Sequence, residues 1–175
     1  ERVLGLVALP ILTMLGSCSS LEVRAETEID APPSMVWEIL SDLPRYPEWN
    51  PYHLPVLMTA ESSPARVGDV VRMRILRPDG NSEEIDPEIL RLEVERELAW
   101  GGGLPGVFYG EHVFRLEALP KGGTHLVHTE VFDGAAVGTA DLPPAVLKRG
   151  LELVNAALKA RAETRTRRLR KVAEQ

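Results

Sequence analysis

The sequence contains a single cysteine, Cys18, so no disulfide can form within its 175 residues. Its three consecutive glycines, at residues 101–103, are not followed by the Lys and Ser or Thr of a phosphate-binding loop. No local pair of ligands supports a metal site, and no serine or cysteine motif marks a catalytic nucleophile. These absences argue against a fold stabilised by disulfides and against nucleotide-dependent or metal-dependent chemistry. We predict neither a metal nor a cofactor.

Most of the chain also lacks an excess of positive charge. Nine of its 20 Lys and Arg residues, but only three of its 26 Asp and Glu residues, lie from residue 148 onward. Residues 1–147 therefore carry a net charge of −12, which would repel a phosphate backbone. We predict no nucleic-acid partner and interpret the basic C-terminal segment as the solvated face of a helix. The length and composition predict one soluble domain with a sizeable core.

A hydrophobic run of membrane-spanning length is missing, although the N-terminal residues are apolar. Residues 3–16 carry no charge, and Pro10 interrupts them. Such a run is too short to cross a hydrocarbon core of about 30 Å, but it suits the apolar region of a signal peptide. The sequence Leu15-Gly16-Ser17-Cys18 resembles the lipobox of bacterial lipoproteins, in which the cysteine is acylated.

From this pattern we predict that residues 1–20 comprise a signal peptide, a lipobox and a short tether. Lipidated Cys18 would hold an exported lipoprotein at a membrane surface without spanning the membrane. The alternatives are a simple signal anchor, or a buried cysteine in a cytoplasmic protein. Folding is then expected to begin at Leu21, and residues 21–175 form the single domain.

The domain shows alternating strand and helix patterns. Apolar and charged residues alternate over residues 21–30, which predicts a strand with one face in solvent. Residues 34–41 have helical spacing. In the connector at residues 46–51, one helical turn limited by Pro47 and Pro51 would place the Tyr46 and Trp49 rings on one side. Further strands are expected at residues 54–60, 69–76, 83–95 with a bulge near Ile89, 98–100, 107–119 and 124–133.

The longest expected element is a C-terminal helix that starts at about residue 143. It carries one apolar stripe, formed by Leu147, Leu151, Val154 and Leu158. A helix of this length needs a large apolar partner surface, which a sheet with one charged and one apolar face supplies. The sequence therefore predicts an α+β fold. A curved antiparallel sheet of about six to seven strands would wrap around the long C-terminal helix, with two short helices between the first two strands.

Several short motifs follow one another in this chain: Ile29-Asp30-Ala31-Pro32, Val36-Trp37, Tyr46-Pro47-Glu48-Trp49-Asn50-Pro51, Leu98-Ala99-Trp100, Gly110-Glu111-His112-Val113-Phe114 and residues 123–134. Because of these motifs, residues 21–161 resemble the START-like or SRPBCC superfamily. This superfamily includes lipid-transfer domains, polyketide cyclases and dehydrases, and the birch-pollen-allergen fold. The resemblance implies a helix-grip fold with a deep apolar cavity. Members bind lipids, sterols, polyketides, quinones or hormones, and some cyclise or dehydrate them, so the fold does not select the chemistry.

Three ionisable residues in the two long strands, His112, His128 and Glu130, are the candidates for catalysis. A histidine beside a carboxylate could exchange protons during enolisation or dehydration of a ketide. If Leu119 pairs directly with Thr124, His112 and His128 lie on opposite faces of the sheet; a one-residue shift places them together, and we favour this register. The alternative is that these polar residues only brace the sheet. His53 and His125 are expected to be exposed or at a rim.

The predicted function is the binding or transport of a hydrophobic or amphipathic small molecule such as a lipid, polyketide or quinone. We favour a binding protein over an enzyme. One alternative is a cyclase or dehydratase that uses the cavity His and Glu residues, and another is a protein-interaction module without enzymatic activity. The ligand and the oligomeric state are not predicted. The expected ligand-binding residues are Trp37, Tyr46, Trp49, Trp100, His112, Phe114, His128, Glu130 and Phe132.

Overall fold

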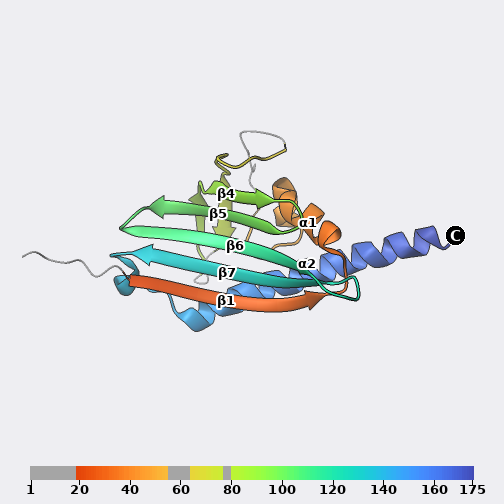
Figure 1. Cartoon of the computed structure of the whole chain (residues 1–175). Coiled ribbons are helices and arrows are strands. Elements are labelled where there is room, and N and C mark those ends of the chain that lie inside the picture. Colours follow the sequence, from red (N-terminus) through yellow and green to blue (C-terminus); the bar gives the residue numbers. More distant parts are fainter. Residues whose placement is uncertain (1–18, 55–63, 77–79) are drawn as a thin grey trace, which may run out of the picture.

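The computed structural model describes residues 19–54, 64–76 and 80–175 (Figure 1). Its elements in chain order are β1 (Ser19–Ile29), α1 (Pro33–Ser41), the 3-10 helix η1 (Leu43–Glu48), β2 (Met73–Leu76), β3 (Ser82–Ile85), β4 (Glu88–Glu93), β5 (Glu97–Leu104), β6 (Phe108–Ala118), β7 (Thr124–Gly134), the 3-10 helix η2 (Val137–Thr139) and α2 (Pro144–Ala173). The two short helices α1 and η1 lie between the first two strands, as predicted.

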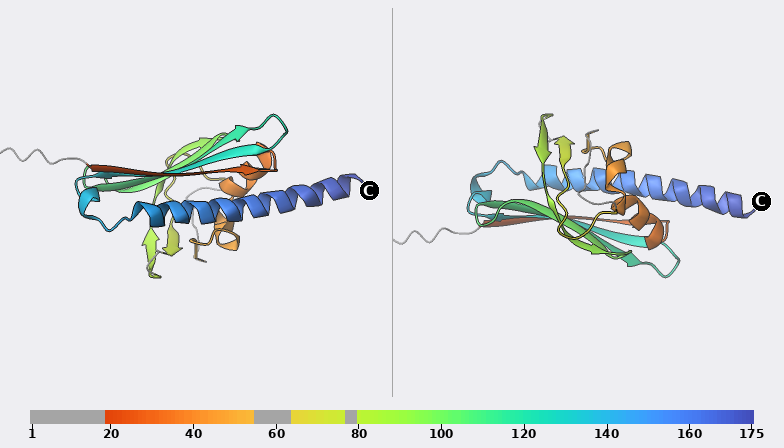
Figure 2. Two further views of the ribbon diagram at one scale, coloured as in Figure 1. Left: turned by 90° about the horizontal axis from the view of Figure 1, so that it is seen from below. Right: turned by 90° about the horizontal axis from the view of Figure 1, so that it is seen from above.

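Five strands form an antiparallel sheet in the order β1-β7-β6-β5-β4, and β2 and β3 form a separate two-stranded hairpin. The curved sheet is one layer, and α2 runs along its inner face as the second layer (Figure 2). The seven strands and the long helix confirm the predicted α+β helix-grip fold. The C-terminal end of α2 extends past the edge of the sheet (Figure 1).

The alternation along β1 explains how the two layers meet. Val23, Ala25 and Ile29 are buried, whereas the charged residues between them are exposed. Val23 and Ala25 pack against Leu151 of the predicted α2 stripe. Val154 and Leu158, further along the stripe, belong to the main core. One face of the strand and one stripe of the helix thus bury each other.

Two features of the sheet differ from the sequence expectation. The strand predicted at residues 83–95 is divided into β3 and β4, because Pro87 between them has no N–H to donate to a ladder. The expected bulge does occur, as a shift of register between Ile89 and Arg91. The glycines at residues 101–103, expected as a break, continue β5 to Leu104. Gly103 has φ +118°, and a Cβ there would lie 2.3 Å from the Phe108 carbonyl oxygen, so glycine permits this close approach.

The start of the fold also differs from expectation. β1 begins at Ser19, where Ser19 and Ser20 pair with Gly134 and Asp133 instead of forming a tether. The predicted signal peptide and Cys18 lie outside the described residues, as does most of the strand expected at residues 54–60. Among the described helices, none has the length and apolar character needed to span a membrane.

Candidate functional site

The register of β6 and β7 brings the predicted polar residues together. Ala118 pairs with Thr124, so His112 lies directly opposite Glu130. Phe114 in turn lies opposite His128. Because side chains alternate across a strand, His112, His128 and Glu130 project from the same face. The favoured register is therefore confirmed, and this face is the one that packs against α2.

Four side chains on this face form a continuous polar chain: Glu130, His112, His128 and Asn155. The Nε2 atoms of His112 and His128 are hydrogen-bonded to each other. His128 Nδ1 lies 2.7 Å from Asn155 Oδ1 on α2. At the other end, His112 Nδ1 lies 3.6 Å from Glu130 Oε1. The polar chain thus connects two strands of the sheet to the long helix.

The partners of His128 determine where its proton lies. Its Nδ1 faces Asn155 Oδ1, which can only accept a hydrogen bond, so Nδ1 carries the hydrogen. Burial lowers the pKa of His128 well below its ordinary value, and the charge of His112 lowers it further. His128 is therefore neutral at pH 7, its Nε2 accepts a hydrogen bond, and His112 Nε2 is the donor.

The two imidazoles lie within an aromatic cluster. The His128 ring stacks on Phe114 with the centroids 4.0 Å apart, and the His112 ring stacks on Trp100 at 5.2 Å. Tyr46 lies edge-on to Trp100 at 5.9 Å. Tyr46 also contacts Trp49, with the centroids 4.8 Å apart, which confirms that η1 places these two rings on one side. The connector and the two long strands therefore meet at one site.

His53 belongs to this cluster, contrary to the expectation that it is exposed or at a rim. Its ring lies 5.1 Å from that of Tyr46, and both of its nitrogens are buried. Burial lowers the pKa of His53 to about 4, with a smaller effect from the charge of His112. His125 does lie at the surface, where its Nε2 is 2.9 Å from Glu26 Oε2. The expectation was thus wrong for the histidine that immediately follows the connector.

Several buried polar atoms at this site have no hydrogen-bond partner among the described residues. They are Trp49 Nε1, both ring nitrogens of His53, and Asn155 Nδ2. Thr166 Oγ1, further along α2, is the fifth such atom in this part of the chain. An unpaired buried polar group costs roughly 1–3 kcal/mol. Three of the five belong to Trp49 and His53, which both contact Tyr46, and the fourth belongs to Asn155 at the buried end of the polar chain. A water molecule or the polar group of a ligand would relieve the cost at either place.

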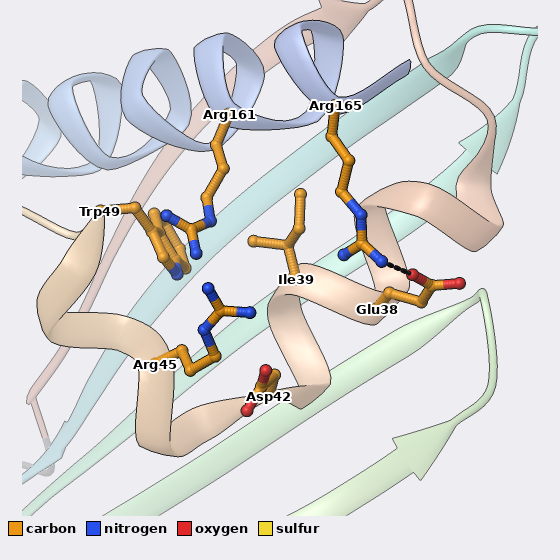
Figure 3. A pocket seen from close by; sticks show the side chains of 7 residues that line it. All are labelled: Glu38, Ile39, Asp42, Arg45, Trp49, Arg161 and Arg165. Atoms are coloured by element: carbon orange, nitrogen blue, oxygen red, sulfur yellow. Dashed lines mark hydrogen bonds and ion pairs between the residues drawn. The ribbon is translucent and has the colours of Figure 1, made fainter. Parts of the chain in front are cut away.

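A small pocket lies nearby, between α1, η1 and α2 (Figure 3). Its volume is about 10 Å³, which is about the space of one water molecule. Arg45 and Arg161 both bind Glu48 and lower the pKa of that carboxyl to about 2. Arg165 binds Glu38 across the same pocket. Since acidic partners already hold these arginines, the pocket does not present a free positive charge.

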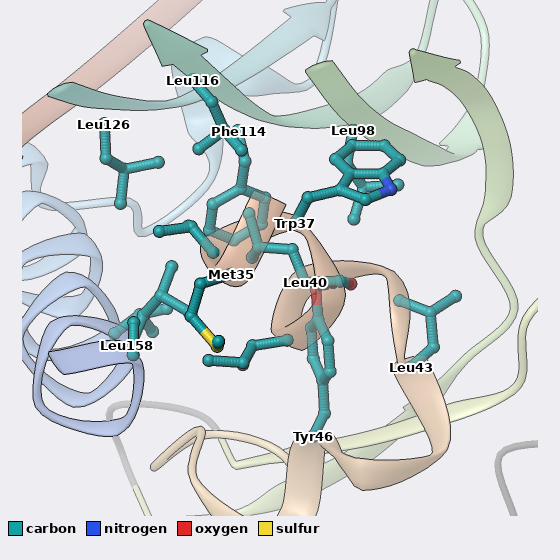
Figure 4. Close-up of a cluster of buried hydrophobic side chains, with 14 of the residues drawn as sticks. Met35, Trp37, Leu40, Leu43, Tyr46, Leu98, Phe114, Leu116, Leu126 and Leu158 are labelled. Carbon is teal, nitrogen blue, oxygen red and sulfur yellow. Dashed lines mark hydrogen bonds between the residues drawn. The ribbon is translucent and has the colours of Figure 1, made fainter. Parts of the chain in front are cut away.

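The residues expected to line a deep cavity are mostly packed against one another. Tyr46, Phe114 and His128 have no accessible surface, so no water-sized space borders them. Figure 4 shows Tyr46 and Phe114 among the side chains of the main core. Trp37, Trp100 and Phe132 are also buried, and Trp49 is half-buried. The side chains of His112 and Glu130 remain 22% and 23% exposed. The polar chain is therefore reached from outside at these two residues and is closed at Asn155.

The sequence interpretation missed Asn155 and His53. Asn155 follows Val154 and lies four residues after Leu151, so it stands beside the apolar stripe of α2. A polar residue at that position was the signal that could have identified it. His53 gave no comparable signal, because its burial depends on how the connector folds against the sheet. Within the described residues, His112, His128 and Glu130 do not form a group that could hold a metal ion.

Comparison with solved structures shows the same fold in several proteins. An aromatase/cyclase, Zhui, from Streptomyces sp. R1128 is 22% identical, with a TM-score of 0.64 over 85% of this chain and 96% of that one. A START superfamily protein from Mycobacterium smegmatis is 19% identical, with a TM-score of 0.63 over 82% and 97%. Ginseng major latex-like protein 151 from Panax ginseng is 18% identical, with a TM-score of 0.65 over 82% and 97%.

At these identities the structural similarity establishes the fold alone. No curated protein sequence matches the chain significantly. The family described as polyketide cyclase/dehydrase and lipid transport matches residues 20–174, which is nearly the whole described structure. This match agrees with the helix-grip architecture. The chain belongs to the polyketide cyclase/dehydrase and lipid transport family.

Proposed function

We propose that this protein binds a hydrophobic or amphipathic small molecule, such as a lipid, polyketide or quinone, between the inner face of the sheet and α2. The observation that supports this most directly is the unpaired amide of Asn155 at the buried end of the polar chain. A ligand with an apolar body and one polar group would satisfy this amide. Family membership supports the same class of ligand.

The energetics of such binding follow from the surroundings of the site. Each Å² of apolar ligand surface removed from water stabilises the complex by about 25 cal/mol. A carbonyl or carboxylate oxygen of the ligand would accept a hydrogen bond from Asn155 Nδ2, which has no other acceptor among the described residues. Apolar contacts thus provide affinity, and the polar chain fixes which end of the ligand is buried.

Entry of a ligand requires the aromatic cluster to open. Tyr46 and Phe114 are completely covered in this structure, and Phe114 stacks directly on His128. The bound form would therefore have a larger separation between these rings. His112 and Glu130 are the accessible members of the polar chain, so we place the entrance on their side of the site.

Native mass spectrometry of the full chain, purified from its own host, tests the proposal. We expect a retained small molecule of defined mass, extractable into organic solvent. Asn155→Leu should reduce its occupancy, because the variant removes the amide donor at similar size. Thr166→Val is the matched control, since Thr166 Oγ1 is also buried and unpaired on α2 but lies outside the polar chain. Equal occupancy in the two variants, or no retained molecule, would refute the proposal.

A second candidate function is a cyclase or dehydratase activity. It is supported by the succession of Glu130, His112 and His128, which can hold a proton beside a bound carbonyl compound. In this role the Glu130 carboxylate or His112 would remove a proton next to the ligand carbonyl, and the resulting enolate oxygen would be stabilised by hydrogen bonding. Ligand binding alone does not require the Glu130 carboxylate.

Exchange of the α-protons of a bound ketone with solvent deuterium distinguishes a cyclase or dehydratase from a carrier. A long-chain methyl ketone incubated with the protein in D₂O should lose its α-protons faster than in buffer, as followed by NMR, if the site enolises ketones. Glu130→Gln should abolish this acceleration while the bound ketone remains. Glu22→Gln, on the exposed face of β1, is the control. If the wild-type protein binds the ketone without accelerating exchange, it functions as a carrier for this compound class.

We further propose that lipidated Cys18 places this protein at a membrane surface. The composition of residues 3–16 and the lipobox-like residues before Cys18 support this localisation. Intact mass spectrometry of the membrane fraction of the host should detect the added mass of acyl chains. Cys18→Ser should remove this mass and release the protein from the membrane fraction. An unmodified wild-type chain in the soluble fraction would contradict the proposal.

A further inference from the structure

The structure has one sheet end that is almost free of charge. It consists of the β5–β6 turn at residues 104–107 and the segment after β7 at residues 135–140, which we call the uncharged end. Leu104 and Val107 in the turn are 63% and 46% exposed. We propose that the uncharged end rests on the surface of a lipid bilayer. This inference is independent of which small molecule the protein binds.

The composition of this end differs from the rest of the chain. Residues 98–110 contain no Asp, Glu, Lys or Arg, and residues 134–147 contain only Asp141. In the whole chain, 26% of residues are charged. A scattered exposed apolar residue needs no explanation, but exposed apolar residues within a charge-free surface mark an interaction site.

The opposite end of the same strands has the usual surface composition. The β4–β5 turn there contains Glu93, Glu95 and Arg96 around one exposed apolar residue, Val94, which is 68% exposed. The two ends of β5 thus have similar exposed apolar residues but different charge. Of these two ends, the one at residues 104–107 could approach a bilayer while removing fewer neighbouring charges from water.

Backbone hydrogen bonds hold the uncharged end together as one unit. Ala135 N donates to Gly106 O at 3.1 Å, and Ala136 N donates to Val107 O at 2.8 Å. Gly134 approaches Val107 so closely that a Cβ would lie 2.4 Å from the Val107 carbonyl oxygen. Two segments that are distant in sequence are therefore fixed against each other. Their internal hydrogen bonds also satisfy backbone groups that would face the lipid interface.

The position of the N-terminal chain indicates a bilayer as the partner of this end. Ser19, the first described residue, pairs with Gly134, so residues 1–18 join the fold at the uncharged end (Figure 1). Those residues include the uncharged segment 3–16 and Cys18. Cys18 directly precedes Ser19, the first residue of β1. Either the apolar segment or an acyl chain on Cys18 would therefore enter the membrane close to the uncharged end. Leu104 and Val107 would then be held at the interface.

Exposed basic residues nearby suit an anionic membrane surface. Lys148 lies in the first turns of α2, which starts on the same side of the sheet, and Arg149 beside it is paired with Glu152 (Figure 2). Lys and Arg next to inserted apolar residues are attracted to anionic headgroups. We therefore favour the bilayer over self-association.

Hydrogen exchange of the full chain with vesicles of phosphatidylcholine and phosphatidylglycerol tests the inference. We expect slower exchange at residues 104–107 and 135–140 when vesicles are present, and no change at residues 94–96. Binding without protection of the uncharged end, or no binding, would overturn the inference. Protection that appears without vesicles and increases with protein concentration would also overturn it, in favour of a second copy.

Substitutions at the uncharged end provide a second, independent test of its contact with vesicles. Leu104→Glu combined with Val107→Glu should abolish the vesicle-induced protection of the uncharged end, because two apolar contacts are replaced by charges. Val94→Glu is the matched control and should behave like the wild type. Both variants change exposed residues, so circular dichroism should show an unchanged fold. If both variants retain the protection and bind vesicles like the wild type, the uncharged end is not the contact.

Discussion

The Nε2 atoms of His112 and His128 are hydrogen-bonded to each other across two neighbouring strands. This bond can contain only one proton, because two N–H groups pointing at each other would repel. His128 has its own hydrogen on Nδ1, where Asn155 Oδ1 accepts it. A further proton on His128 would place a charge in the core, and the bond would persist only if His112 Nε2 became the acceptor. The neutral form of His128 is therefore favoured in the folded protein.

This arrangement predicts that the protein loses stability in mild acid. The pKa values of His128 and His53 are lowered in the folded state, so the unfolded chain binds more protons as the pH falls below about 6.5. The stability contributed by each neutral histidine is complete above that pH and is lost progressively below it. For His53, a folded pKa of about 4 corresponds to a loss of about 3 kcal/mol at most.

Urea unfolding between pH 7 and pH 4 measures this effect. His53→Phe should reduce the slope of the unfolding free energy against pH, because a phenyl ring fills the site without binding a proton. His125→Phe is the control, since His125 lies at the surface between Glu26 and Glu117. An unchanged slope in His53→Phe would show that this histidine is protonated in the folded protein.

A second prediction concerns Gly134, the last residue of β7. Its φ is +130°, and a Cβ would lie 2.4 Å from the Val107 carbonyl oxygen. Gly134→Ala should therefore destabilise the fold by about 3 kcal/mol or more, since the backbone must shift. Gly122→Ala is the matched control: its φ is +83°, but no atom lies within 4 Å of the added Cβ. It should cost only about 1 kcal/mol. Equal losses in thermal unfolding would show that the close approach to Val107 is relaxed in solution.

The general fold was predictable because its elements have strong sequence periods. The alternation over residues 21–30 and the stripe from Leu147 to Leu158 each fix one buried face, and these faces require each other. The finer points depended on single residues. Pro87 divided one expected strand, and three glycines extended another, because a close neighbouring backbone made glycine useful inside β5.

The candidate site was predictable only in part, because strand register controlled it. His112, His128 and Glu130 were identified as polar residues on long strands, and their shared face followed once the register was correct. Asn155 comes from a helix 27 residues further along the chain than His128. Its contact with His128 depends on how α2 crosses the sheet, which no local pattern encodes. The burial of His53 likewise arises from tertiary packing against Tyr46.

A third prediction concerns Glu95 in the β4–β5 turn. It is the one non-glycine residue with positive φ in the described chain, at φ 60°. Left-handed backbone costs a side-chain-bearing residue roughly 1–2 kcal/mol, which glycine avoids. Glu95→Gly should therefore stabilise the protein by up to about 1 kcal/mol after the larger entropy of the unfolded glycine is included. Glu95→Ala removes the same carboxylate but keeps the strain, so its melting temperature should stay near that of the wild type. A lower melting temperature for Glu95→Gly than for Glu95→Ala would disprove the argument.

The last prediction concerns the tautomer of His128. Because Asn155 Oδ1 accepts from Nδ1, NMR of ¹⁵N-labelled imidazoles should show a protonated Nδ1 and an unprotonated Nε2 on His128 at neutral pH. Asn155→Asp should allow His128 to become a cation at a higher pH, because a carboxylate 2.7 Å away stabilises the charged ring. Asn155→Leu, which offers no acceptor, should leave His128 neutral. A wild-type His128 protonated on Nε2 would reverse the direction of the His112 bond, and the polar chain could not pass a proton from the Glu130 side toward His128.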